Sequence, residues 1–173
     1  KYLMWKDLVD RTDQLKDNAV VAHLIDTPRE PFEQDSVFVE PGELDNRLSP
    51  AELYAPLNYD SSQLAAVVAS SDGKNFVMIG PPGTGKSQTI ANIIAHNLGL
   101  GRTILFVSEK AAALDVVYRR LREQGLGEFC LELHSNKAKK LDVLRQLGDA
   151  WDVRGRLSPG DWDKQTQRLR VVR

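Results

Sequence analysis

The sequence is poor in the residues that hold small secreted domains and metal clusters together. Its 173 residues include a single cysteine, Cys130, so neither an internal disulfide nor a multi-cysteine metal site can form. The histidines, His23, His96 and His134, lie far apart in the sequence, which argues against a structural zinc site. No apolar run approaches the roughly 18 residues that a membrane helix needs, and the N-terminus lacks the pattern of a signal peptide. These absences predict a cytoplasmic globular protein that has no contact with a membrane.

Charge is unevenly distributed along the chain, although the net charge is only −1. Residues 1–60 carry 6 basic and 13 acidic side chains, whereas residues 61–173 carry 17 basic and 11 acidic ones. A basic excess in one part of a chain is typical of a surface that binds a polyanion, and equally of solvated helix faces. Charge alone leaves both interpretations open.

Residues 1–56 have an irregular pattern. Helices are expected over 3–17 and 19–26, and Asn18 is placed to cap the second one. Five prolines then interrupt the chain between positions 28 and 56, so this stretch is expected to be loop with one short strand at 36–39. We therefore predict an N-terminal appendage over residues 1–56, mainly helical and then a proline-rich loop.

From residue 57 onward, apolar runs alternate with helical patterns. The apolar runs predict strands over 76–79, 103–107 and 129–133. Helices are expected over 61–71, from the end of the turn at 80–87 to Gly99, over 110–124 and over 137–150. This alternation predicts an α/β fold in which helices cover both faces of a parallel sheet over residues 57–150. Ser158-Pro159 predicts the start of a further helical segment within residues 151–173.

The turn between the first apolar run and its helix, GPPGTGKS at residues 80–87, matches the motif G-x-x-x-x-G-K-[ST] at every defined position. Gly83 and Gly85 let the backbone point its N–H groups into one concavity, and the following helix directs its positive end at the same place. Lys86 can reach the phosphates of a nucleotide, and the Ser87 hydroxyl can ligate the accompanying Mg²⁺. The motif predicts binding of a nucleoside triphosphate with Mg²⁺, against the alternative of a plain glycine–proline turn.

Gln63, before the first apolar run, has two possible roles. Its amide offers both the donor and the acceptor that the N6/N7 edge of adenine requires. However, Asp60-x-x-Gln63 is also a capping box, in which Asp60 caps the helix and Gln63 reaches back to the cap. The residues alone leave both roles open. The predicted nucleotide-binding residues are Gln63, Gly80, Pro82, Gly83, Thr84, Gly85, Lys86, Ser87 and Gln88, and Lys86 and Ser87 are also the predicted catalytic residues.

Hydrolysis additionally needs an acidic residue at the end of another strand, to hold Mg²⁺ and position water. After the strand expected at 103–107, Ser108 takes the position where an aspartate is expected, and Glu109 comes next. This strand is also the one that directly follows the helix of the phosphate motif. Neither residue suits the role well. We expect the chain to be a fragment of a longer protein, cut before its acidic motif.

Residues 57–147 resemble the first RecA-like domain of superfamily 1 helicases, in the branch that includes the nonsense-mediated-decay helicases. LNYDSSQLAAV resembles the glutamine motif of that branch, GPPGTGKS its motif I, and ILFVSEKAAALDVV its motif Ia. GPPGTGKSQTIANIIAHNL and FCLELHS are similar to large bacterial helicase-related proteins. The resemblance implies that Gln63 reads adenine in ATP and that residues 57–150 are a partial RecA-like P-loop ATPase domain.

The resemblance also implies partners and an activity. Ser108, Lys110, His134 and Ser135 would lie at the nucleic-acid edge of the domain, facing a single strand, DNA in preference to RNA. A second RecA-like domain of the same parent chain would supply the arginine finger, so the parent would hydrolyse ATP and this fragment alone little or none. The alternatives are an AAA+-type or other P-loop ATPase that remodels its target, and a nucleotide-dependent switch module without enzymatic activity.

Overall fold

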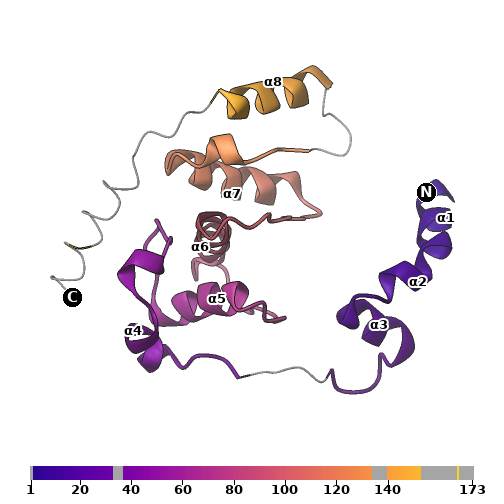
Figure 1. Cartoon of the computed structure of the whole chain (residues 1–173), viewed down its shortest axis with the longest axis horizontal. Helices are drawn as coiled ribbons and strands as arrows, with labels where there is room; N and C mark the ends of the chain where they lie inside the picture. Colours follow the sequence, from indigo (N-terminus) through magenta and orange to yellow (C-terminus); the bar gives the residue numbers. More distant parts are fainter. Residues whose placement is uncertain (1, 33–36, 134–139, 153–166, 168–173) are drawn as a thin grey trace. The chain divides into compact units, whose positions relative to one another are not determined.

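The computed structural model describes residues 2–32, 37–133, 140–152 and 167. The chain divides into two compact units, Lys1–Val37 and Phe38–Arg173 (Figure 1). The predicted division into 1–56, 57–150 and 151–173 stays a prediction. No helix in the described ranges combines the length and the hydropathy needed to cross a bilayer.

The first unit is built from short helices with exposed side chains. They are α1 (Tyr2–Asp10), α2 (Thr12–Leu15) and α3 (Ala19–Asp26). Asn18 caps α3 as predicted, because its Oδ1 accepts hydrogen bonds from the N–H groups of Val20 at 3.0 Å and Val21 at 3.2 Å. The helix expected over 3–17 is interrupted at Arg11, between α1 and α2.

In its described part, the second unit contains five further helices, of which α5 and α6 carry the candidate site. They are α4 (Leu44–Arg47), α5 (Ser61–Ser71), α6 (Lys86–Gly99), α7 (Ala111–Glu123) and α8 (Lys140–Trp151). Short 3-10 turns connect them at η1 (Pro41–Glu43), η2 (Pro50–Glu52) and η3 (Gly127–Phe129). Helix α6 packs between α5 and α7, as Figure 1 shows. The predicted start of a helix at Ser158 lies outside the described residues.

Two apolar clusters fill the spaces around α5, α6 and α7. One joins Val39 and Leu44 to the inner face of α5. The other joins α6 to α7 through residues that include Ile94 and Val117. The inner face of α6 also buries polar side chains, namely Thr89, Asn92, His96 and Asn97. Helix α6 is therefore held by hydrogen bonds as well as by apolar contacts.

The predicted parallel sheet is wrong for the described residues, to which the structure assigns no strand. The three apolar runs, 76–79, 103–107 and 129–133, lie between helices and form neither helix nor strand, except that the last begins at the end of η3. Each run is partly buried at alternate residues only: Ile79 is 92% exposed and Leu105 87% exposed, whereas Ile104 and Phe106 pack against the cluster of α6 and α7. Unbroken apolar runs predict burial on both faces, but here only one face of each run is covered. The short strand expected at 36–39 is likewise not formed over 37–39, and residue 36 lies outside the described part.

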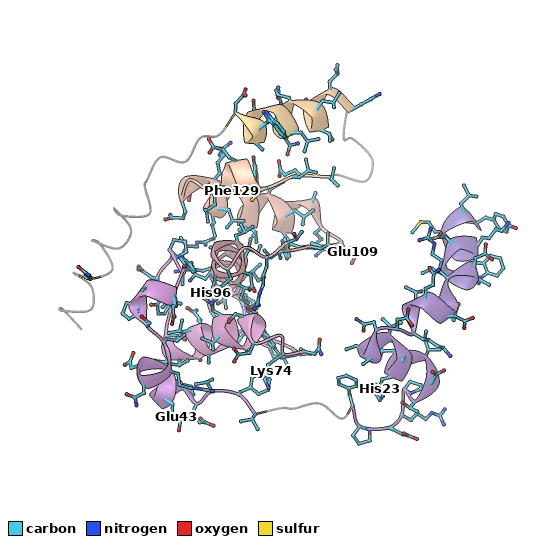
Figure 2. All side chains as sticks on the ribbon, in the orientation of Figure 1. His23, Glu43, Lys74, His96, Glu109 and Phe129 are labelled. Atoms are coloured by element: carbon cyan, nitrogen blue, oxygen red, sulfur yellow. The ribbon has the colours of Figure 1, made fainter. Side chains whose placement is uncertain are left out.

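His96, on the inner face of α6, couples the stability of this unit to pH (Figure 2). The side chain is only 3% exposed, and its Nδ1 accepts a hydrogen bond from the Tyr54 N–H at 3.3 Å, which requires an unprotonated nitrogen. Burial, with a contribution from the charge of Arg102, lowers the pKa of His96 below its usual 6.5, and Asp72 opposes this shift. Between pH 6.5 and the lower pKa of the folded state, the unfolded chain therefore binds a proton that the folded chain does not.

We expect the free energy of unfolding to be unaffected by His96 above pH 6.5 and to decrease as the pH falls from there to the lower pKa of the folded state. The slope contributed by one such group is at most about 1.4 kcal/mol per pH unit. Urea unfolding of the wild type and of His96→Gln, measured between pH 5 and 8 at about one-unit steps, checks this. The glutamine variant should lack this part of the slope, and an identical slope in both proteins would contradict the assignment.

Candidate nucleotide-binding site

The loop at residues 80–87 leads from extended chain directly into α6. Gly83 and Gly85 have φ angles of +87° and +76°, in the left-handed region that favours glycine. Gly85 is the N-cap of α6, and no side chain caps this helix. The first N–H groups of α6 therefore face the loop without a side-chain acceptor, which suits the binding of an anion at the positive end of the helix.

Lys86 lies across the loop that precedes it. Its Nζ donates hydrogen bonds to the carbonyl oxygens of Gly80 and Pro81. The Thr84 hydroxyl donates to the same Pro81 oxygen at 2.9 Å, and a Cβ on Gly80 would lie 2.7 Å from Thr84 Oγ1. The ammonium group has three N–H donors and uses two of them here, so one remains for a phosphate oxygen.

Gln63 forms the predicted capping box and also contacts the loop. The Asp60 carboxylate accepts from the Gln63 N–H at 2.8 Å, and Gln63 Oε1 accepts from the Asp60 N–H at 3.1 Å. In addition, Gln63 Nε2 donates to the Thr84 carbonyl oxygen at 3.0 Å. The capping role is thus confirmed, and one N–H and one acceptor site of the amide are left over.

The capping aspartate is held in its charged form. Hydrogen bonds from the Ser62 hydroxyl at 2.6 Å and from the Gln63 N–H lower the pKa of Asp60 below its usual 3.8. The capping box is therefore intact at neutral pH and is lost only as the pH falls through this lowered pKa.

An open hollow of about 420 Å³ lies beside the loop. This is within the range of roughly 300–1,000 Å³ that is usual for small-molecule sites. Its lining residues come from the stretch before α5, from the first turn of α5, from the loop and from α6; they are Asn58, Tyr59, Asp60, Gln63, Gly83, Thr84, Gly85 and Gln88. Asn58 and Tyr59 were not predicted as site residues, although they lie in the same LNYDSSQ segment as Gln63.

Gly85 should be the loop position least tolerant of a side chain. A Cβ there would lie 2.6 Å from Gln63 Nε2, in addition to the strain of a positive φ. Gly73, in the turn after α5, has a similar φ of +73° but nothing within 4 Å of its Cβ position, so Gly73→Ala is a matched control. We expect Gly73→Ala to cost about 1–2 kcal/mol of unfolding free energy, and Gly85→Ala about 1 kcal/mol more, because the Gln63 amide must move. Equal losses in denaturant titrations would contradict this contact.

The residues predicted to face nucleic acid are only partly described. Ser108 and Lys110 lie together before α7, where the Ser108 hydroxyl accepts from the Lys110 N–H at 3.3 Å. Glu109, between them, is exposed on the connection that leads into α7 (Figure 2). His134 and Ser135 lie outside the described residues. The structure therefore does not test the predicted nucleic-acid edge.

No group of three or more His, Cys, Asp or Glu side chains that could hold a metal ion occurs in the described part of the chain. Ser87, the predicted Mg²⁺ ligand, lies in the first turn of α6 and is partly exposed. A serine hydroxyl at this position fits an ion that is shared with phosphate oxygens rather than one held by protein ligands alone.

The profile of the AAA domain family matches residues 58–168, which is most of the second unit. The chain belongs to this family. Helicases are similar to part of the chain: an uncharacterized ATP-dependent helicase of Mycoplasma pneumoniae is 56% identical over 63 residues, which are 36% of this chain and 6% of the relative. The DNA polymerase alpha-associated DNA helicase A of Schizosaccharomyces pombe is 34% identical over 116 residues, which are 64% of this chain and 18% of the relative.

A similar ATP-dependent helicase of Mycoplasma genitalium is 55% identical over 47 residues, 27% of this chain and 4% of the relative. The chain thus spans between 4% and 18% of the length of these relatives. No solved structure matches the chain. Together these similarities confirm the predicted kinship with the ATP-binding domain of superfamily 1 helicases.

Proposed function

We propose that the chain binds ATP with Mg²⁺ at residues 80–87 and acts as the ATP-binding portion of a superfamily 1 helicase or translocase. The observation that carries this proposal is the loop itself. It contains two left-handed glycines, leads into a helix start that no side chain caps, and carries the Lys86 ammonium group over its backbone. Each of these features favours a phosphate group, and the helicase relatives point to ATP.

Different residues bind different parts of the nucleotide. The N–H groups of residues 83–87 bind the phosphate oxygens, and Lys86 adds a charge-assisted hydrogen bond. Ser87 Oγ holds Mg²⁺, which neutralises charge on the phosphates when it is bound. On the other side of the loop, Gln63 uses its remaining N–H and acceptor site to read adenine, while the capping box keeps its amide in place.

The proposal extends to nucleic acid. The basic excess of residues 61–173 and the position of Ser108 and Lys110 before α7 support contact with a phosphate backbone. We favour single-stranded DNA because one of the relatives is a DNA helicase. Hydrolysis coupled to movement requires a second RecA-like domain with its arginine finger, contributed by the whole protein.

The test is steady-state ATP hydrolysis by the whole protein that contains this chain, with and without single-stranded DNA or RNA. The proposal predicts turnover that single strands stimulate, more strongly with DNA. Turnover that is indifferent to every nucleic acid would favour a remodelling ATPase instead, and binding of ATP without any turnover would favour a nucleotide-dependent switch. Either result would overturn the helicase assignment.

A further inference from the structure

The stretch of chain just before α5 is fastened to α6 by a row of polar side chains. Gln88, Asn92 and His96 follow one another at intervals of four residues, so they lie along one face of α6. Gln88 Nε2 donates to the Asn58 carbonyl oxygen, and His96 Nδ1 accepts from the Tyr54 N–H. Residues 54–58 therefore run along α6 in the direction opposite to the helix.

Asn92 is the centre of this row and makes the best-formed contacts. Its Oδ1 accepts from the Leu57 N–H, and its Nδ2 donates to the Leu57 carbonyl oxygen, both at 2.9 Å. The side chain is completely buried, with 0% of its surface exposed. An amide is the group that can satisfy both backbone atoms of one residue at once, so the side chain replaces the partner that Leu57 would have in a sheet.

The spacing of the row suits the chain that it holds. From residue 88 to residue 96 a helix rises by about 12 Å, and the chain from residue 54 to residue 58 can cover at most about 13 Å. The segment is therefore long enough for each of the three side chains to meet one of its backbone groups, with a bend at Leu57, where Asn92 binds. Tyr54 packs closely against the end of α6, where a Cβ on Gly99 would lie 2.4 Å from the ring atom Cγ.

These contacts form a closed series of links that includes the residues of the proposed nucleotide site. Helix α6 begins at the end of the loop of residues 80–87, here called the phosphate loop, and its side chains bond to the backbone of Leu57 and Asn58. The chain continues from there through Asp60 to Gln63. Gln63 in turn donates a hydrogen bond to the Thr84 carbonyl oxygen in the phosphate loop. Asn58, Tyr59 and Gln63 line the hollow beside the loop. We call these three residues the base-side wall of the hollow. Their position depends on the attachment of the preceding chain to α6.

We propose that Asn92 is a positioning residue for base recognition: by holding Leu57 against α6, it fixes Asn58, Tyr59 and Gln63 relative to the phosphate loop. This inference rests on the proposed binding of ATP at that loop. Asn92 touches no nucleotide itself. Its loss loosens the base-side wall but leaves the phosphate loop at the start of α6.

The test compares Asn92→Leu with Asn97→Leu in the complete chain. Asn97 is a matched control because it is also a buried asparagine of α6, only 6% exposed, but its Nδ2 donates to Ser70 Oγ at the far end of α5. Dissociation constants are measured for Mg·ATP, Mg·GTP and inorganic tripolyphosphate, and thermal unfolding is followed for each protein. Both variants should unfold at lower temperature, because both leave buried polar groups unpaired.

We expect the preference for ATP over GTP to fall at least about five-fold in Asn92→Leu and to stay unchanged in Asn97→Leu. Affinity for tripolyphosphate should stay within about two-fold of the wild type in both. An unchanged ATP preference in folded Asn92→Leu, or an equal loss in Asn97→Leu, would overturn the inference and leave the proposed function standing. Failure of tripolyphosphate and ATP to bind the wild type would overturn the proposed function itself.

Two further observations keep the inference testable if Asn92→Leu does not fold. Asn92→Ser removes the same amide with a smaller change in the apolar surroundings, and the same loss of ATP preference is expected. In the unmodified chain, the Leu57 N–H should exchange slowly with solvent, because Asn92 Oδ1 accepts its hydrogen bond. Rapid exchange at Leu57 would show that the attachment does not hold and would overturn the inference.

Discussion

Lys86→Ala is expected to weaken the binding of Mg·ATP about 10- to 150-fold, which corresponds to about 1.5–3 kcal/mol for a hydrogen bond to a charged group. The ammonium group is held over the loop by the carbonyl oxygens of Gly80 and Pro81, so it is already positioned where the phosphates would bind. Isothermal titration of the chain with Mg·ATP measures the effect. Under the proposed function, hydrolysis by the whole protein should fall at least as much, because Lys86 would also stabilise the charge that develops on the transferred phosphoryl group.

Lys74→Ala is the matched control, since it removes the same charge from the same unit, in the turn after α5. It should leave the affinity for ATP unchanged. Circular dichroism should show that both variants keep the helix content of the wild type, because Lys86 bonds only to carbonyl groups of its own loop. If Lys86→Ala and the wild type bind ATP with equal affinity, residues 80–87 are ruled out as the binding site.

Replacement of Gln63 should reduce the preference for ATP over GTP by about 5- to 150-fold, the equivalent of about 1–3 kcal/mol for a base edge read by one amide. The complication is that Gln63 also closes the capping box of α5 and bonds to Thr84. Gln63→Ala removes all of these interactions together. It therefore changes helix stability and base reading at the same time.

Gln63→Glu separates the two roles. A glutamate keeps an oxygen for the Asp60 N–H, so the capping box of α5 should survive. It has no N–H for the Thr84 carbonyl oxygen or for the base. We expect both variants to lose the preference for ATP, but only Gln63→Ala to lose helix stability. If Gln63→Ala lowers stability and neither variant changes the ATP:GTP ratio, Gln63 is a capping residue only.

The sequence predicted the helices well where local chemistry decides them. Asn18 and Asp60 start α3 and α5 because short polar side chains satisfy N–H groups within the same turn. Gly99 is the last residue of α6, and Gly101 follows it with a φ of +75°. The glycines and lysine of residues 80–87 likewise form a local motif, and the binding of phosphate by this loop stays a prediction.

The parts that were predicted wrongly or missed depend on contacts between distant segments. The run at 76–79 is apolar throughout, but its composition does not say whether one face or two are covered, and Ile79 is 92% exposed. The sequence did not indicate that Asn92 is buried and holds Leu57, because a single asparagine in an amphipathic helix is usually solvated. Its role becomes visible only when residues 54–58 are placed along α6.

The central claim, that residues 80–87 bind the triphosphate of ATP, is tested most directly by amide NMR of the chain during a titration with Mg·ATP. The account predicts chemical-shift changes in residues 83–88, at the phosphates, and in residues 58–63, at the base. Tripolyphosphate should reproduce the first group of changes without the second. Changes confined to other parts of the chain, or none at ATP concentrations in the millimolar range, would contradict the account.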